Sequence, residues 1–148
     1  IFDLARYAKS KGYIVIVITN QAGIARGYYS ELDFLALTNW MCNQFMTEGV
    51  LINKVYFSPY HPVHGLGRYK KDDVSRKPSP GMLYEAMNEF DIDLQSSVLI
   101  GDNVTDIQAG FSAGVGKNLY FGSDDISHHA GLGNYLNINN LSEASQYL

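Results

Sequence analysis

Short apolar runs alternate with segments of helical periodicity along this chain, and this alternation is what most constrains its fold. Tyr13–Ile18 and Val98–Ile100 are rich in β-branched residues, which is typical of strands buried on both faces. Between them, one predicted helical face carries Phe34, Leu37, Thr38, Met41 and Phe45. Strands that alternate with helices form parallel sheets. The sequence therefore predicts an α/β domain in which helices flank a parallel sheet.

The remaining elements follow from the same patterns. Further strands are expected at Leu51–Phe57, Asn118–Phe121 and Tyr135–Ile138. Helices are expected at 1–11, from Ser30 to about Phe45, at 80–90 and at 106–113, and a short one is expected near the end of the chain. Their predicted boundary residues are Gly12, Ser30 with Asp33 as its capping-box acid, Pro80, Gly114 and Ser142. Thr19–Tyr29 and Ser58–Ser79 are expected to be irregular loops, and loops as long as the second are often functional.

Composition excludes several classes of protein. The 148 residues are 46% hydrophobic and 18% charged, as expected of one globular domain. A net charge of −4 argues against nucleic-acid binding, which depends on phosphate neutralisation. The single cysteine, Cys42, excludes an internal disulfide and fits a reducing compartment. No apolar run is long enough to span a membrane. We therefore expect a cytoplasmic protein, a monomer or a weak homodimer.

Two carboxylates follow the strand at Val98–Ile100, in the stretch Gly101-Asp102-Asn103-Val104-Thr105-Asp106. Open α/β sheets bind ligands at the carboxyl ends of their strands. Carboxylates gathered there commonly hold Mg²⁺, which prefers oxygen ligands and bridges to phosphate. The stretch therefore predicts a magnesium site.

Two other segments could contribute to phosphate binding. Thr19-Asn20-Gln21 ends a strand and offers a hydroxyl, an amide and loop N–H groups, although the same residues also suit an ordinary turn. Arg76-Lys77-Pro78-Ser79-Pro80 precedes a helix and offers two cations on a stiff backbone, although it could equally be a solvated basic turn.

Taken in order, these three segments resemble those of haloacid dehalogenase (HAD) superfamily phosphatases. The detailed sequence is similar to that of D-glycero-D-manno-heptose 1,7-bisphosphate phosphatases. The similar segments are Thr19-Asn20-Gln21-Ala22-Gly23-Ile24-Ala25-Arg26-Gly27, Tyr60-His61-Pro62 and Arg76-Lys77-Pro78-Ser79-Pro80-Gly81-Met82-Leu83. Histidinol-phosphate phosphatases share much of this pattern. The resemblance extends from Ile1 to about Phe121 and implies a Rossmann-like HAD fold without a large cap domain.

The resemblance also implies a mechanism and a set of residue roles. In this family one aspartate forms a phospho-aspartyl enzyme, a second aspartate two residues later is the general acid and base, and Mg²⁺ neutralises the phosphoryl oxygens. The implied catalytic residues are Thr19, which hydrogen-bonds the phosphoryl group, Lys77, which stabilises its charge, and Asp102, which ligates Mg²⁺. The implied substrate site contains Thr19, Asn20, Gln21, Ala22, Arg76, Lys77 and Asn103. Asp106 is expected to orient Lys77 or the metal shell.

The sequence departs from the family in its nucleophile. The family's nucleophile lies in an Asp-x-Asp-Gly-Thr-like motif after the first, central strand, and no such motif exists in these residues. Asp91-Ile92-Asp93 precedes a strand instead of following one, and Phe2-Asp3-Leu4-Ala5 has Ala5 in place of the second aspartate. Without a central strand, its neighbours would expose unpaired edges. We therefore expect these residues to be the C-terminal part of a longer, active protein.

A second departure lies in the long loop. Many heptose bisphosphate phosphatases bind a structural zinc there through three Cys and one His. The matching positions here are Ser58, Tyr60, Asp73 and Ser75. None of them is a thiolate, so no structural zinc is expected. Either the loop is held by its own packing or it is mobile.

The function predicted from the sequence is Mg²⁺-dependent hydrolysis of a small phosphorylated metabolite through an aspartyl-phosphate. Heptose bisphosphate is the leading substrate and histidinol phosphate is the enzymatic alternative. An alternative of another class is a non-catalytic phosphate-binding module or an inactive fragment. A nucleic-acid end phosphatase is disfavoured by the acidic balance of the chain.

Overall fold

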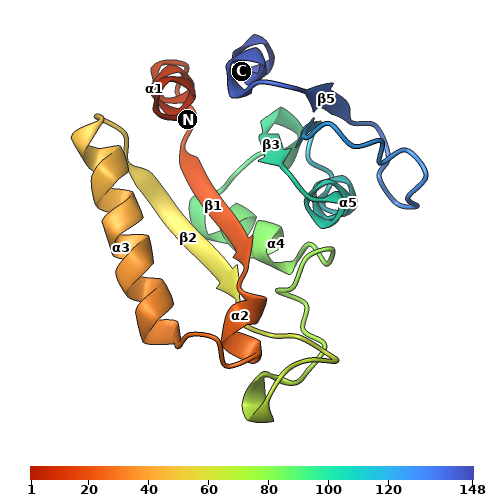
Figure 1. The fold of residues 1–148 in the computed structure, drawn as a ribbon. Helices are drawn as coiled ribbons and strands as arrows, with labels where there is room; N and C mark the ends of the chain where they lie inside the picture. The colour runs from red at the N-terminus through yellow and green to blue at the C-terminus, as the bar shows by residue number, and fades with distance from the viewer.

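Every strand pairing is parallel in the computed structural model, which describes residues 1–148 (Figure 1). The five strands form two separate sheets, with the strand orders β1–β2 and β3–β4–β5. The strands are β1 (Val15–Asn20), β2 (Ile52–Ser58), β3 (Val98–Gly101), β4 (Lys117–Phe121) and β5 (Leu136–Ile138). The predicted α/β class with parallel strands is confirmed.

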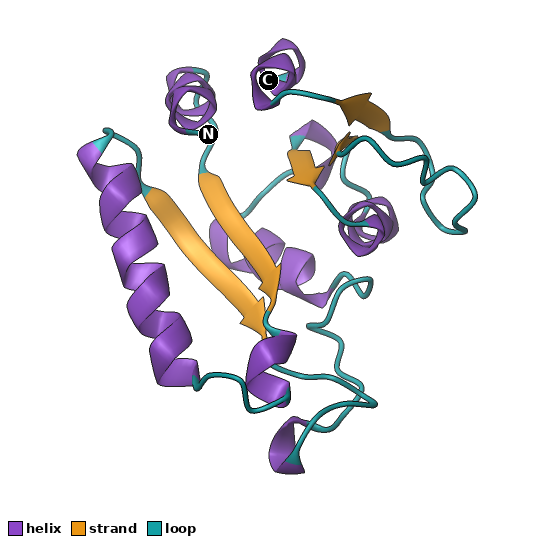
Figure 2. Ribbon diagram, viewed as in Figure 1, coloured by secondary structure: helices purple, strands orange, loops and turns teal.

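Helices cover both sides of the strands (Figure 2). The α-helices are α1 (Phe2–Ser10), α2 (Ala22–Ala25), α3 (Glu31–Thr47), α4 (Gly81–Phe90) and α5 (Val104–Ala113). Three 3₁₀ helices, η1 (Gly67–Tyr69), η2 (Leu94–Ser96) and η3 (Leu141–Tyr147), complete the set. Figure 1 shows α3 on one side of the β1–β2 pair and α4 on the other, while α1 lies beside η3. None of these helices combines the length and the apolar character needed to cross a bilayer.

Local sequence chemistry explains the helix ends. Ser30 accepts a hydrogen bond from the backbone of Asp33, whose carboxylate bonds back to the Ser30 backbone, so the predicted capping box is confirmed. Gly114 ends α5 at a φ of 81°, a left-handed conformation that favours glycine. Tertiary packing then fixes α3, because Phe34 stacks on Phe57 of β2 with ring centroids 4.6 Å apart.

Several details of the sequence prediction were wrong. The loop predicted at Thr19–Tyr29 contains α2, because the glycine-containing stretch has enough small and apolar residues to form one turn. Leu37 does not share the burial of Phe34 on the predicted helical face: it is 61% exposed because α3 contacts the sheet through the side that carries Phe34. The final helix is capped by Asn140 instead of Ser142, since the Asn140 side chain accepts a hydrogen bond from the Ser142 backbone.

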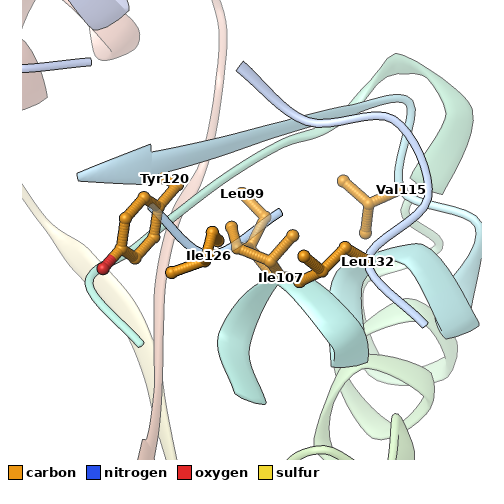
Figure 3. Close-up of a cluster of buried hydrophobic side chains, with 6 residues drawn as sticks. All are labelled: Leu99, Ile107, Val115, Tyr120, Ile126 and Leu132. Carbon is orange, nitrogen blue, oxygen red and sulfur yellow. The ribbon is translucent and has the colours of Figure 1, made fainter. Parts of the chain in front are cut away.

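The main hydrophobic core lies under the three-stranded sheet (Figure 3). Ile107 of α5 is fully buried at its centre and packs with Leu99 of β3 and Tyr120 of β4. Ile18 of β1 and Leu83 of α4 pack against the edge of this cluster. The core therefore joins the two sheets on one side although no ladder of hydrogen bonds links them.

A cleft of about 370 Å³ lies between the two sheets. Its walls are formed by Val17, Ile18 and Thr19 of β1 and by Leu99, Ile100 and Gly101 of β3. Each of these strands pairs with a neighbour on its other side, β1 with β2 and β3 with β4. The edges that face the cleft therefore carry backbone groups without a strand partner.

Candidate functional site

Four polar side chains that the sequence singled out line this cleft. Thr19 comes from the end of β1, Asp102 follows β3, Asp106 lies in the first turn of α5, and Lys77 reaches in from the loop before α4. Thr19 at the carboxyl end of β1 and Asp102 just after β3 line the same cleft, and α/β folds bind ligands at the carboxyl ends of their strands. The fold thus brings together residues that are more than 80 positions apart in sequence (Thr19 and Asp102).

Lys77 is held by three residues of β1 and α5. Its ammonium lies 2.6 Å from the Asp106 carboxylate and donates a 3.0 Å hydrogen bond to the Ile18 carbonyl. The Asn20 side chain makes two hydrogen bonds to the Lys77 backbone. It accepts from the Lys77 N–H and donates to the Lys77 carbonyl, both at 3.0 Å. The residue is 8% exposed. A buried ammonium oriented in this way can stabilise negative charge on a bound anion.

Asp106 has two partners besides its place in the cleft wall. One carboxylate oxygen pairs with Lys77, and the other accepts a 3.0 Å hydrogen bond from the Asn103 backbone. The Asn103 side chain accepts from Thr105 and caps α5. A side chain at Gly101 would put its Cβ 2.3 Å from the Cβ of Asp106. Glycine at this position therefore lets Asp106 approach the end of β3.

A chain of hydrogen bonds orients the Thr19 hydroxyl. Tyr29 donates its hydroxyl proton to Oε1 of Gln21 at 2.7 Å, which turns the Gln21 amide nitrogen toward Thr19. That nitrogen donates to Thr19 Oγ1 at 2.9 Å. Because Thr19 Oγ1 accepts here, its own proton is available to a ligand in the cleft. A Cβ at Gly23 would stand 2.2 Å from the aromatic ring of Tyr29, so glycine at this position leaves room for the ring.

Further positive charge lies next to Lys77. Arg76 directly precedes Lys77, and its guanidinium donates to the Tyr60 carbonyl at 3.1 Å. Burial is the main cause that lowers the pKa of Arg76, and the nearby Arg26 adds to this effect. Burial also lowers the pKa of His61, with a further contribution from Arg76. Neither Arg26 nor Arg76 forms an ion pair with a carboxylate, so the positive charge of both guanidinium groups is available to an anion.

Comparison with known proteins agrees with this geometry. Residues 74–121 match a family model described as HAD-hydrolase-like. Over 130 residues the chain is 55% identical to the D-glycero-alpha-D-manno-heptose-1,7-bisphosphate 7-phosphatase of Burkholderia mallei. The matched residues make up 88% of this chain and 69% of that protein. The chain belongs to this family of HAD phosphatases. The resemblance inferred from the sequence is therefore confirmed.

Other members of the family give the same result. The D-glycero-beta-D-manno-heptose-1,7-bisphosphate 7-phosphatase of Vibrio cholerae is 40% identical over 80% of this chain. A crystal structure of a candidate HAD-like phosphatase from Mesorhizobium loti superposes with a TM-score of 0.84 at 33% identity, covering 99% of this chain and 70% of that one. The D,D-heptose 1,7-bisphosphate phosphatase of B. bronchiseptica, complexed with magnesium and phosphate, shares the fold with a TM-score of 0.79 at 18% identity.

The chain spans a part of the proteins that it matches. It covers 69% of the Burkholderia relative, 64% of the Vibrio relative and 63% of one from Yersinia pestis. Within residues 1–148, neither aspartate-rich segment reaches the cleft. Asp91 ends α4 in a left-handed conformation and Asp93 caps η2, while Asp3 lies within α1.

A single carboxylate in the cleft is available to a metal ion in this HAD phosphatase. Asp102 is exposed and makes no hydrogen bond or ion pair, whereas both oxygens of Asp106 are engaged. Magnesium is commonly held by one or two carboxylates together with water and substrate phosphate. The donor set therefore fits Mg²⁺ through Asp102, with water and substrate phosphate as further ligands.

The four positions that match the family's zinc ligands do not fit that metal. Asp73 accepts from Ser75 with one oxygen and from Lys71 with the other, at 2.7 Å in each case. Ser58 is fully buried and its hydroxyl bonds to Ser75 at 3.0 Å. Tyr60 points its ring toward Lys71, whose ammonium lies 3.9 Å from the ring centroid. A closed zinc site needs four donors, mostly thiolate or imidazole, and these residues provide none of that kind.

The structure adds residues that the sequence did not single out. Tyr29 and Gly101 act on the site through Gln21 and Asp106, and only the folded chain brings these pairs together. Of the expected site residues, Thr19, Lys77, Asp102 and Asp106 line the cleft. The side chains of Asn20, Gln21 and Asn103 bond to neighbouring protein groups, and Ala22 begins α2. Their expected roles in substrate binding remain predictions.

Proposed function

We propose that the protein is a Mg²⁺-dependent phosphatase that removes one phosphate from D-glycero-D-manno-heptose 1,7-bisphosphate. The observation that carries this proposal is the convergence of Thr19, Lys77 and Asp102 on one cleft at the carboxyl ends of two parallel strands. A hydroxyl donor, a fixed ammonium and a free carboxylate are the groups that position a phosphoryl group and its metal ion. The names of relatives at up to 55% identity support the same activity.

The residues of the chain divide the work of phosphoryl transfer. The Lys77 ammonium stabilises the charge that develops on the phosphoryl oxygens, while Asp106 keeps Lys77 in place. The Thr19 proton, which Gln21 leaves available, donates to a phosphoryl oxygen. Bound through Asp102, Mg²⁺ would neutralise further charge on these oxygens. That metal proposal is supported by the magnesium and phosphate bound to the B. bronchiseptica protein of the same fold.

The nucleophile in this proposal is an aspartate outside residues 1–148, carried by a strand between β1 and β3. The facing edges of these strands and the cleft between them support this arrangement, in which the chain is one HAD-like domain. The aspartate oxygen bonds to phosphorus as the bond to the sugar oxygen breaks. A second aspartate protonates the leaving oxygen and then activates water to release phosphate.

The charges near the cleft favour a bisphosphate over histidinol phosphate. Arg26 acts on the charge of Arg76 and neither residue forms an ion pair, which suits a second phosphate on the substrate. Histidinol phosphate carries an ammonium group in place of a second phosphate, and the two guanidinium groups would repel it. The net charge of −4 also disfavours a nucleic-acid substrate. We further propose that the protein works in the cytoplasm as a monomer.

Phosphate release by the full-length natural protein tests this proposal. Heptose 1,7-bisphosphate in both anomeric forms, histidinol phosphate and an oligonucleotide with a terminal phosphate are compared, each with Mg²⁺ and with excess chelator. We expect the heptose bisphosphates to have the highest kcat/KM, with activity lost in chelator. Phosphate binding without turnover would instead identify a binding module, and preferential turnover of histidinol phosphate would identify the alternative enzyme.

A further inference from the structure

The long loop between β2 and α4 is tied together by a network of five side chains. They are Ser58, Tyr60, Lys71, Asp73 and Ser75, which we call the loop clamp. Ser58 ends β2, and the other four come from the two ends of the loop. The clamp occupies the positions at which the family's zinc ligands are expected.

A lysine ammonium lies at the centre of the loop clamp. Lys71 Nζ is 2.7 Å from Asp73 Oδ2 and 3.9 Å from the centroid of the Tyr60 ring. It therefore joins a residue at the start of the loop to one near its end. A cation between a carboxylate and an aromatic face is attracted by both. The pKa of Asp73 is lowered to about 2, first by Lys71 and then by Ser75, so the carboxylate remains charged at neutral pH.

The other side of Asp73 continues the network into the protein. Asp73 Oδ1 accepts from both the hydroxyl and the backbone N–H of Ser75, at 2.7 and 3.0 Å. The Ser75 hydroxyl also bonds to Ser58, which is fully buried at the end of β2. The ladder of β1 and β2 pairs Ser58 with Asn20, the residue that grips the Lys77 backbone. The clamp is thus anchored on the strand beside the cleft.

The loop clamp determines where Arg76 points. Arg76 follows Ser75 directly, its backbone N–H bonds to the Asp73 carbonyl at 2.9 Å, and its guanidinium bonds to the carbonyl of Tyr60. Both of these carbonyls belong to clamp residues. Movement of Asp73 would therefore displace the Arg76 backbone, and movement of Tyr60 would displace the Arg76 guanidinium.

We propose that Lys71 is a positioning residue that replaces a metal ion in this loop, holding Tyr60 and Asp73 so that Arg76 faces the second phosphate of the substrate. The role of Arg76 in this inference depends on the proposed function. The role of the Lys71 ammonium in holding the loop does not depend on the proposed function, because it follows from the contacts alone. The loop is then ordered without zinc and insensitive to zinc chelators.

The test uses the full-length protein with Lys71→Met, Lys71→Arg and the matched control Lys70→Met. Lys70 is the exposed neighbour of Lys71 and makes no ion pair. Hydrogen exchange of the Ser75 and Arg76 amides reports on the clamp without activity. We expect faster exchange in Lys71→Met, near-normal exchange in Lys71→Arg, whose guanidinium also stacks on aromatic rings, and no change in Lys70→Met.

Kinetics then test the link to Arg76. We expect Lys71→Met to raise KM for heptose bisphosphate about tenfold, with kcat on para-nitrophenyl phosphate unchanged because that substrate has no second phosphate. Unchanged hydrogen exchange in Lys71→Met would overturn the inference. So would a KM that changes by the same factor for heptose bisphosphate and para-nitrophenyl phosphate. The inference also fails if the protein binds one equivalent of zinc and needs it for slow exchange. If the parent protein does not hydrolyse heptose bisphosphate but Lys71→Met still exchanges faster, the proposed function fails while the clamp stands.

Discussion

The ammonium of Lys77 lies 2.6 Å from the carboxylate of Asp106, and both side chains are 10% exposed. This buried ion pair connects the loop before α4 with the first turn of α5 and stands at the wall of the cleft. Removing charges from water is costly, and a buried pair needs good geometry and further hydrogen bonds to compensate. The Ile18 carbonyl and the Asn103 backbone provide those bonds.

Replacing Lys77 with Met should destabilise the protein by about 3–5 kcal/mol, because Asp106 would be left as a buried charge without a partner. Unfolding in urea, followed by circular dichroism, measures this change. The double variant Lys77→Met/Asp106→Asn should recover part of the stability because the uncompensated charge is gone. Phosphatase activity should stay low in both variants, and recovery of activity in the double variant would contradict the role of Lys77.

Gly101→Ala should disturb the same pair without changing any charge. The new Cβ would stand 2.3 Å from the Cβ of Asp106, so the aspartate must move away from Lys77 and from the cap of α5. We expect a loss of about 1–3 kcal/mol in unfolding free energy, as for other overpacked sites. Activity should fall at a temperature where the variant is still folded, and wild-type activity there would show that the position of Asp106 does not matter.

Tyr29→Phe should lower kcat about fivefold, the effect expected from losing one hydrogen bond that orients a catalytic donor. Without the Tyr29 hydroxyl, the Gln21 amide is free to rotate, and the Thr19 proton is no longer directed to the substrate. Tyr28→Phe is the matched control, since Tyr28 is 72% exposed and its hydroxyl makes no hydrogen bond. Equal kcat values for the two variants would contradict the role of Tyr29 in orienting Gln21 and Thr19.

The stability of the loop clamp should depend on acid pH through Asp73. The pKa of this carboxyl is lowered from 3.8 to about 2 by its bonds to Lys71 and Ser75. A folded-state pKa below the unfolded value adds stability that is present at higher pH and is lost as the pH falls from about 4 to 2. Unfolding free energies measured across this range should fall less steeply for Asp73→Asn than for the parent protein or for Asp72→Asn. Parallel curves for all three proteins would contradict the clamp.

The sequence was sufficient for the elements whose signals are local. The capping box of Ser30 and Asp33 and the helix end at Gly114 depend on a few neighbouring residues and were predicted correctly. The exposure of Leu37 was not predictable from periodicity, because its helix packs through the side that the position of β2 selects. Local propensity carries no information about that position.

The site shows the same division. Its motif residues could be named from their places next to strand ends or before a helix and from the resemblance to a known family, but their partners come from other segments. Tyr29 reaches Gln21 only after α2 turns the chain back, and Lys71 meets Tyr60 only when the long loop closes. The sequence left open whether this loop is packed or mobile, since a lysine between a tyrosine and an aspartate has no signature in sequence. The contacts of the loop clamp indicate that the loop is packed.

The most direct test of the central claim is to follow heptose 1,7-bisphosphate by phosphorus NMR with full-length protein and Mg²⁺. The account predicts that the signal of the phosphate on carbon 7 disappears, that one equivalent of inorganic phosphate appears, and that the phosphate on carbon 1 remains. Lys77→Met should slow this conversion by about 10²–10³-fold, as does the loss of other groups that stabilise transition-state charge. Release of the phosphate on carbon 1, or no release at all by folded protein, would contradict the account.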